Sequence, residues 1–360
     1  MISDPILVID FGSGFVKAGF AGNDAPSLIF PTVVGKPHRH IKSASGGSDI
    51  LIGEAAQANP EVIPTYPIER SVVKNWQNMS SIISYIYQTL DLKGENNNVL
   101  ISRPSGVDTK QLEKLTEEFL ESIRSPSISF ISSATLSLLS TGRVTGIVAE
   151  CGYGVTNVVP IFESFGLEHA RITSDLGGCD VDAYLKILLK KIGMTENDNN
   201  AVREVKEQLC YVQSTPDQPE PEPTPYEPPS GNRLMIGPEK HLAAEVLFDP
   251  SVNGGKMMGI SKALSTSISR CDKYLRKDLL NNVVISGGST MFPGMAERVE
   301  HDVSDATQSL AKVIAAPERK NGAWVGASIF ASTPVFEQFQ IKKADWETNG
   351  EKIFRQKSFM

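Results

Sequence analysis

The chain has 360 residues, of which 40% are hydrophobic and 21% charged, and its formal net charge at pH 7 is −7. This length exceeds what one hydrophobic core usually supports, so we expect two domains. The negative charge argues against a nucleic-acid or membrane surface, no apolar run is long enough to cross a membrane, and the first residues lack the pattern of a signal peptide. The four cysteines show no CxxC spacing and the five histidines no metal-ligand spacing, which predicts reduced thiols and no zinc site.

A glycine hairpin is predicted at residues 6–21. Its first apolar run ends in Asp10, the turn follows at Gly12–Gly14, and a second apolar run begins at Phe15. A buried strand, a tight turn and a return strand are the natural interpretation. The glycines let backbone N–H groups approach a ligand closely and favour an anion, and Asp10 is placed to hold a cation or its waters.

The same pattern recurs at residues 145–162. An apolar strand reaches Glu150, the glycines Gly152 and Gly154 follow, and Thr156 begins a β-branched return strand. Two hairpins of one design predict two similar domains that face one another across a cleft. A polyphosphate with Mg²⁺ would fit there, because Mg²⁺ usually takes only one or two carboxylates. The alternative is a pair of ordinary hairpins in a large α/β protein.

Strands and helices alternate in the remainder of the chain. Apolar residues at helical spacing predict helices, and short apolar runs predict strands. The expected helices cover residues 74–90, 109–123, 125–140 and 201–212, and residues 175–192 are expected to be a turn that enters an amphipathic helix. The expected strands cover 99–102 and the run that begins at 283. We expect the helix at 125–140 to cross between the domains. This alternation indicates a mostly parallel sheet that is covered by helices.

A proline-rich segment occupies residues 214–231. Seven of the fourteen residues from Pro216 to Pro229 are proline, and the others are acidic or polar. Because proline donates no backbone hydrogen bond, we expect an extended polyproline-type loop without a strand ladder. The segment is either a docking peptide for an aromatic-lined groove or a solvated loop that replaces a hairpin.

Six sequence blocks resemble the actin family. They are DFGSGFVKAGFAGNDAP (residues 10–26), YPIE (66–69), LSLLSTGRVTGIV (136–148), VKEQLCYV (205–212), VISGGSTMFPG (284–294) and APERKNGAWVGASIFAS (316–332). They occur in family order and at near-family spacing, so the resemblance covers essentially the whole chain. The chain is more similar to an actin-related protein than to conventional actin.

The resemblance implies an α/β, actin-like fold in which two duplicated α/β domains, divided into four subdomains, surround a nucleotide cleft. Both chain termini would lie in the small domain. The implied boundaries are 1–140 plus 322–360 for the small domain, with subdomain 2 at about 32–66, and 141–321 for the large domain, with subdomain 4 at about 177–255 and the proline-rich loop at 214–231.

The resemblance also implies a site for ATP or ADP with Mg²⁺. Asp10 and Glu150 would hold the metal through water. The residues implied to bind the nucleotide are Gly12, Ser13, Gly14, Lys17, Gly152, Tyr153, Gly154, Arg203, Lys206, Glu207, Gly287, Gly288, Met291 and Lys320.

The positions that serve hydrolysis in the family are degenerate in this chain. Ser133 stands where conventional actin has a glutamine that positions the attacking water, and Asn157 stands where it has a histidine. Glu150 and Tyr153 each replace an aspartate. Serine is too short to reach the same place, and the extra methylene of Glu150 displaces its carboxylate. We therefore expect nucleotide binding with weak or no hydrolysis, and we assign no catalytic residue.

The contacts that build filaments in the family are altered as well. The exposed loop at residues 42–48 is almost wholly polar, and Gly254–Gly255 with Lys256 weaken the apolar plug expected at residues 248–260. The chain is therefore expected to polymerise little by itself.

Together these features imply an actin-related structural protein, a subunit of a cytoskeletal or other actin-containing assembly. Its partners would be other actin-family subunits or actin-binding proteins, with no nucleic acid and no membrane, in the cytoplasm or alternatively the nucleus. One alternative is a conventional polymerising actin-type ATPase. Another is a phosphotransferase of the wider sugar-kinase and chaperone superfamily, which would need a sugar-binding aspartate in the cleft.

Overall fold

The computed structural model describes residues 5–37, 50–59, 61–194, 199–215, 218–228 and 233–357. The chain divides into two compact units: unit 1 comprises Met1–Arg143 and Asn321–Met360, and unit 2 comprises Val144–Lys320. The polar loop predicted at residues 42–48 lies outside the described residues, and the further division into four subdomains stays a prediction. Within the described ranges, no helix is long and apolar enough to cross a membrane.

The main sheet of unit 1 is mixed rather than mostly parallel, which corrects the sequence-based expectation. Its central strand, β1, pairs antiparallel with β2 and parallel with β9, and β9 pairs parallel with β10. The strands in spatial order are β19 (Ile341–Lys342), β10 (Ser127–Ser132), β9 (Val99–Arg103), β1 (Leu7–Phe11), β2 (Phe15–Phe20) and β3 (Leu28–Pro31). The predicted hairpin at residues 6–21 is thus confirmed as β1, a turn and β2.

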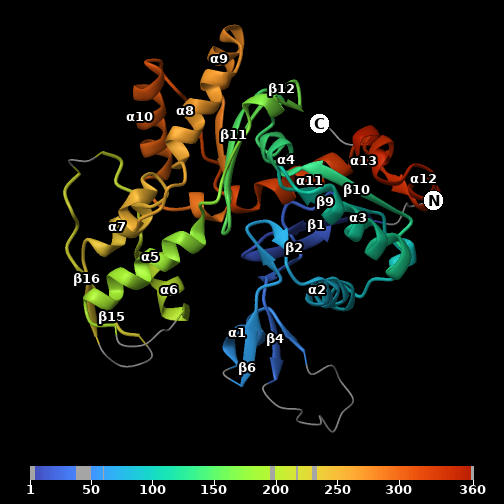
Figure 1. Cartoon of the computed structure of the whole chain (residues 1–360), viewed down its shortest axis with the longest axis horizontal. Coiled ribbons are helices and arrows are strands. Elements are labelled where there is room, and N and C mark those ends of the chain that lie inside the picture. The colour runs from blue at the N-terminus through green and yellow to red at the C-terminus, as the bar shows by residue number, and fades with distance from the viewer. Residues whose placement is uncertain are drawn as a thin grey trace. The chain divides into compact units, whose positions relative to one another are not determined.

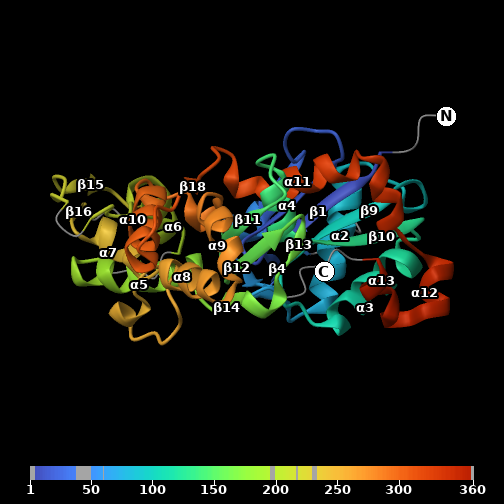
Figure 2. The ribbon, with the colours of Figure 1, turned by 90° about the horizontal axis from the view of Figure 1, so that it is seen from above.

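Helices cover both faces of this sheet (Figures 1 and 2). Because successive strand residues point to opposite faces, Leu7 and Ile9 pack with one set of helices while Val8 packs with the other. Trp324 is fully buried on the second face, where its indole N–H donates to the Val8 carbonyl oxygen over 3.1 Å. The first set is α2 (Trp76–Thr89), α3 (Thr109–Glu117) and α13 (Ile353–Gln356), and the second is α4 (Ser133–Leu139) and α11 (Gly322–Ala331).

Smaller elements complete unit 1. The helix predicted at 109–123 forms α3 and continues as a π-helix at Glu118–Ser122, one residue short of the predicted end. A three-stranded sheet has the order β5-β4-β6, and β7 pairs with β8. These elements are β4 (Val34–Pro37), β5 (Leu51–Ile52), α1 (Glu54–Ala58), β6 (Val62–Thr65), β7 (Ile68–Glu69), β8 (Val72–Val73) and α12 (Lys343–Asn349).

Unit 2 repeats the strand plan of unit 1. Its strand β11 pairs antiparallel with β12 and parallel with β17, just as β1 pairs with β2 and β9. The outer strands continue the match, since β14 pairs antiparallel with β12 and β18 parallel with β17. The strands are β11 (Gly146–Cys151), β12 (Thr156–Phe162), β13 (Phe165–Gly166), β14 (Ile172–Ser174), β17 (Val283–Ser286) and β18 (Val313–Ile314). Two mixed sheets of one topology confirm the predicted duplicated α/β fold.

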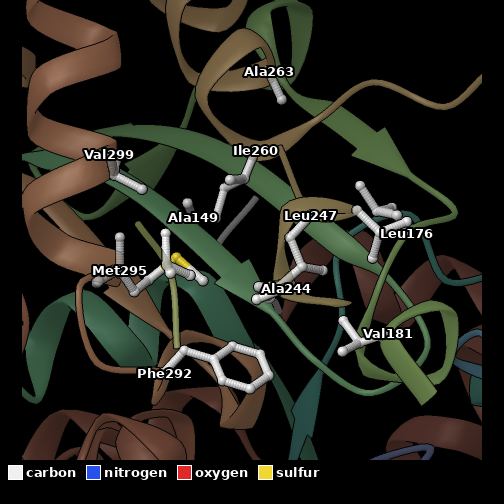
Figure 3. Packing of buried hydrophobic residues seen from close by; sticks show 14 of the residues in the cluster. Ala149, Leu176, Val181, Ala244, Leu247, Ile260, Ala263, Phe292, Met295 and Val299 are labelled. Atoms are coloured by element: carbon white, nitrogen blue, oxygen red, sulfur yellow. The ribbon is translucent and has the colours of Figure 1, made fainter. Parts of the chain in front are cut away.

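The core of unit 2 lies between its sheet and its helices. Ala149 on the sheet faces Ile260 and Val299 on two helices, with Met295 and Phe292 beside them (Figure 3). Each fully buried aliphatic side chain of this kind contributes roughly 1.5–3 kcal/mol to folding. The helices are α5 (Gly178–Lys191), α6 (Asn199–Leu209), α7 (Glu239–Glu245), α8 (Ile260–Arg270), α9 (Lys273–Leu280) and α10 (Met295–Thr307).

The helix predicted at residues 125–140 is wrong in its first half. Residues Ser127–Ser132 form strand β10, and the helix α4 begins only at Ser133. All six strand residues are buried. Because Ile128, Phe130 and Ile131 favour a pleated surface and β10 pairs with both β9 and β19, strand pairing prevails there over the local helical spacing.

The proline-rich segment also departs from expectation. Its residues Thr224–Tyr226 form strand β15, which pairs antiparallel with β16 (Leu234–Ile236). An edge strand tolerates proline because only one of its sides needs to donate hydrogen bonds. The segment is therefore part of a hairpin and does not replace one.

Candidate functional site

Asp10 near the end of β1 lies in a polar row across the sheet of unit 1. In the strand register Lys17 of β2 is directly opposite it on one side and Ser102 of β9 on the other. Lys17 Nζ lies 3.0 Å from Asp10 Oδ2, and the Ser102 hydroxyl donates to Asp10 Oδ1. The Asp10 side chain is 15% exposed. The carboxylate is therefore oriented by a cation and a hydroxyl and still reaches solvent.

The turn Gly12–Gly14 is fixed by Thr32, the residue that follows strand β3. Thr32 donates from its hydroxyl to the Gly12 carbonyl oxygen over 2.7 Å and from its backbone N–H to the Gly14 carbonyl oxygen over 2.9 Å. A Cβ added to Gly12 would lie 2.7 Å from the Phe15 carbonyl oxygen, so only glycine fits without a shift. Thr32 thus holds the backbone of the predicted phosphate turn.

A second turn supports Ser13. The backbone N–H of Ser71 donates to Ser13 Oγ over 3.0 Å, so the Ser13 hydroxyl can donate its own hydrogen to an anion. Arg70 and Ser71 both have positive φ, 45° and 63°, in the turn between β7 and β8. Gln111 holds this strained turn at both sides, since its amide donates to the Ser71 carbonyl oxygen over 3.2 Å and accepts from the Val73 N–H over 2.9 Å.

A cavity of unit 1 lies next to these supporting residues. Ser71, Ser102 and Gln111 are among its lining residues, and most of the others are apolar, such as Phe11 and Leu115. None of the predicted nucleotide or metal residues lines it. This cavity is therefore not the predicted site.

Glu150 occupies in unit 2 the place that Asp10 has in unit 1. In the register of β11 it is opposite Asn157 of β12 and Ser286 of β17, and Asn157 is opposite Thr173 of β14. Asn157 is 3% exposed, and its Oδ1 accepts a hydrogen bond of 2.9 Å from the Thr173 hydroxyl. The row places an amide beside the acid where unit 1 has an ammonium group.

The turn at Gly152–Gly154 is fixed by the start of α5. Backbone N–H groups of Gly178 and Cys179 donate to the carbonyl oxygens of Gly152 and Tyr153 over 3.0 and 2.8 Å. The Ser289 hydroxyl donates to the Gly152 carbonyl oxygen as well, over 2.8 Å. The Tyr153 ring is 38% exposed. The Cys151 thiol just before the turn is fully buried, and burial raises its pKa to about 11, so it stays protonated.

Helix α6 carries the residues implied to border the adenosine. Lys206 Nζ lies 2.7 Å from Asp182 Oδ1 of α5 and 5.4 Å from the centre of the Tyr153 ring. This brings Lys206 to the second glycine turn. Arg203 is half-buried and Glu207 is exposed on the same helix.

The Gly287–Gly288 turn needs its first glycine for steric reasons. Gly287 has φ +93°, and a Cβ there would lie 2.4 Å from the Cys151 carbonyl oxygen, whereas a Cβ on Gly288 would meet no atom within 4 Å. Arg319 clamps the turn: its carbonyl oxygen accepts from the Gly287 N–H over 3.0 Å, and its guanidinium donates to the Thr290 carbonyl oxygen over 2.8 Å. Desolvation lowers the pKa of Arg319 from its ordinary value, but a guanidinium remains charged.

The remaining predicted residues lie at separate places. Met291, just after the Gly287–Gly288 turn, and Lys320, next to Arg319, are both exposed. Ser133 is buried at the start of α4 in unit 1. Among the residues that the structure describes, no three Asp, Glu, His or Cys side chains gather to hold a metal, so Mg²⁺ would need to keep several of its waters.

Sequence reasoning missed the residues that hold the turns in place. These are Ser71, Ser102, Gln111, Thr32, Thr173, Gly178, Cys179, Ser289 and Arg319. Only Ser289 and Arg319 carried a signal in the sequence, since they lie inside blocks that resemble the actin family.

Comparison of the sequence with known proteins supports the resemblance described above. The family model described as "Actin" matches residues 3–197 and 193–359. Centractin of Schizosaccharomyces pombe is 36% identical to the chain over 367 residues, an alignment that covers 98% of this chain and 97% of that protein. The match spans both units, including both glycine hairpins. The chain therefore belongs to the actin family, as an actin-related protein.

Proposed function

We propose that the chain binds ATP or ADP with Mg²⁺ and serves as a subunit of a cytoskeletal or other actin-containing assembly, with other actin-family subunits or actin-binding proteins as partners. It hydrolyses ATP weakly or not at all and polymerises little by itself. The observation that carries the nucleotide proposal is the repeated polar row, with Asp10 beside Lys17 and Glu150 beside Asn157 at the same place in two sheets.

The residues present fit a nucleotide with a divalent cation. Asp10 offers a carboxylate for metal-bound water, and Lys17 beside it offers a cation for a phosphate. Gly12 and Gly287 are required by their tight turns, and the space at Gly288 is open, so a ligand can approach the backbone there. Bound Mg²⁺ would neutralise phosphate charge, while Glu150 and Asp10 would orient its waters.

Slow hydrolysis is proposed because the positions that orient water are altered. Phosphoryl transfer depends on placing the nucleophile and stabilising charge. Ser133 carries a short hydroxyl at the start of α4, and the Asn157 amide oxygen is engaged by Thr173. Losing one such positioning contact commonly costs on the order of a hundredfold in rate.

The assembly role rests on the similarity to centractin, and the weak polymerisation rests on the loop at residues 248–260. Met257 and Met258 are only partly buried, but both pack against the core of unit 2 itself. The Met258 carbonyl oxygen accepts from the Ser174 hydroxyl over 2.8 Å, which ties the loop down. Burial of apolar surface supplies much of the free energy of an interface. Because part of the surface of these methionines already packs within unit 2, less of it is left to be buried in a filament contact.

Nucleotide content and single-turnover hydrolysis test the proposal. Mass analysis of material released from purified protein should find ATP or ADP together with Mg²⁺. The double variant Ser133→Gln with Glu150→Asp should then hydrolyse ATP tens of times faster than the parent, and Ser133→Ala should not. A purified chain without nucleotide, or turnover as fast as that of conventional actin, would contradict it.

Sedimentation distinguishes the alternative, a conventional polymerising actin-type ATPase. We expect the chain at micromolar concentration to stay in the supernatant with Mg²⁺ and ATP. A long homopolymer under these conditions would favour the alternative. Co-purification of the native protein then identifies the subunits that accompany it and the compartment, for which we propose the cytoplasmic cytoskeleton.

A further inference from the structure

Four prolines at alternate positions form an exposed row on unit 2. They are Pro219, Pro221, Pro223 and Pro225, all exposed, and we call them the proline ridge. Pro225 lies in strand β15, and the other three precede it, so exposed proline rings extend along the described part of the segment from residue 219 to residue 225.

The residues between the prolines attach the segment to unit 2. Buried Lys240 of α7, 4% exposed, donates from Nζ to the Glu222 carbonyl oxygen over 3.0 Å and to the Thr224 hydroxyl over 3.1 Å. The Tyr226 hydroxyl donates to Glu204 Oε2 of α6 over 2.9 Å. These contacts involve the residues between and after the prolines, and the proline rings stay exposed.

Further contacts hold the beginning of the ridge. The Gln218 side-chain oxygen accepts from the Ser214 N–H over 2.9 Å, and Glu220 Oε1 lies 3.8 Å from His241 Nε2. Together with the pairing of β15 and β16, this orders the segment before any partner arrives. An ordered segment loses little conformational entropy on binding.

The ridge is unsuited to pairing with a further strand, although its Pro225 lies in β15, which already pairs with β16. Every second residue lacks an N–H group, and proline at a sheet edge prevents another strand from adding to it. What the ridge offers is apolar ring surface, flanked by the exposed carboxylates of Glu222 and Glu227. Aromatic-lined grooves bind extended proline-rich segments, and a basic rim on the groove would complement the carboxylates.

We propose that the proline ridge is the docking surface for a partner protein with an aromatic-lined groove and a basic rim. The ring surface supplies the contact, and the anchors on Lys240 and Glu204 present it in extended form. The surface uses none of the residues assigned to nucleotide, so its failure and that of the proposed function are separable by experiment.

Titration of the full-length chain with purified SH3, WW and EVH1 domains tests the docking surface. At least one domain with a basic rim should bind, and its affinity should fall with rising salt. The variant P219A/P221A/P223A should weaken this binding at least tenfold. The matched control Pro64→Ala changes an exposed proline of unit 1 and should leave the affinity unchanged.

Further measurements separate docking from folding. All variants should keep the parent's far-UV spectrum, melting temperature and nucleotide content. E222Q/E227Q should reduce the salt dependence while the rings still bind. The proposal is overturned if no domain binds, if the triple alanine variant binds as tightly as the parent, or if Pro64→Ala loses as much affinity as the ridge variant.

Discussion

At the scale of single residues, the two acidic positions differ in what stands beside them. Asp10 faces an ammonium group, Lys17, whereas Glu150 faces the amide of Asn157, whose oxygen is engaged by Thr173. Because Thr173 engages the amide oxygen of Asn157, the NH₂ group of that amide is left to donate to another acceptor. Glu150 is the acid directly opposite Asn157 in the hairpin. Thr173 is thus a positioning residue for Asn157.

Replacing Thr173 tests this support. Thr173→Val removes the hydroxyl at nearly constant volume, so Asn157 loses a hydrogen-bond partner and is less firmly positioned opposite Glu150. We expect several-fold weaker Mg²⁺ retention, measured by titration with a chelator while nucleotide release is followed. Thr173→Ser keeps the hydroxyl and should restore retention. Equal retention in the valine variant and the parent would contradict the assignment.

Tyr87 predicts how the stability of the protein responds to alkaline pH. Burial raises its pKa from 10.0 to about 12, although the hydrogen bond of 3.1 Å with Ser125 acts in the opposite direction. The folded protein therefore holds this proton more tightly than the unfolded chain does. The resulting stabilisation is complete below pH 10 and is lost as pH rises toward 12.

Urea unfolding between pH 9 and about 11.5 measures this loss. The free energy of unfolding of the parent should fall steadily above pH 10.0, the pKa of Tyr87 in the unfolded chain. Tyr87→Phe keeps the ring against Phe119 and removes the titrating hydroxyl, so its stability should fall less steeply over the same interval. Identical slopes for both proteins would show that other groups control the alkaline response.

At the scale of elements, a single buried lysine connects β15 to α7. Lys240 donates to a carbonyl oxygen and a hydroxyl of the proline-rich segment. Removing one partner of a buried hydrogen bond costs about 1–3 kcal/mol. An apolar side chain of similar size no longer requires a charge to be buried, which recovers part of that cost. We therefore expect the loss of these hydrogen bonds to affect only the surrounding segment.

Lys240→Met should therefore loosen residues 218–228 and leave the sheet of unit 2 intact. Hydrogen exchange of peptides that cover this segment should speed up about tenfold, while exchange in β11 and β12 stays slow. Lys273→Met, on the exposed start of α9, is the matched control and should change neither. Unchanged exchange at residues 218–228 would show that β15 needs no anchor on α7.

At the scale of the whole molecule, each unit has its own hydrophobic core, and the nucleotide proposal involves residues of both units. A ligand that binds only the folded state stabilises it by about 2.7 kcal/mol at a hundred times its dissociation constant. Removal of Mg²⁺ and nucleotide with a chelator and a nucleotidase should therefore lower the melting temperature by several degrees.

Gly288 provides a control for this experiment. Because a Cβ there meets no atom within 4 Å, Gly288→Val should fold with the melting temperature of the stripped parent. The added side chain fills space proposed for the nucleotide, so ATP should no longer raise that temperature. A normal response to ATP in this variant would remove Gly288 from the site.

The sequence by itself determined the two glycine hairpins, most helices and the family. Each hairpin is encoded by neighbouring residues: an apolar run, an acid, a glycine turn and a return strand. The two strands that pair are only a few residues apart in the sequence. The helices α2 and α6 were predicted from periodicity that needs no distant partner. Local signals of this kind survive in a single sequence because the interacting residues are neighbours in the chain.

The tertiary structure decided what lies beside those local elements. Ser102 is 92 residues from the Asp10 that it holds, and Ser289 is 137 residues from the Gly152 carbonyl oxygen. The strand at residues 127–132 and the strand within the proline-rich segment likewise depend on distant pairing partners. A lone serine or proline has no local preference strong enough to reveal such a partner, because the free energy comes from burial and hydrogen bonding that exist only once the chain has folded.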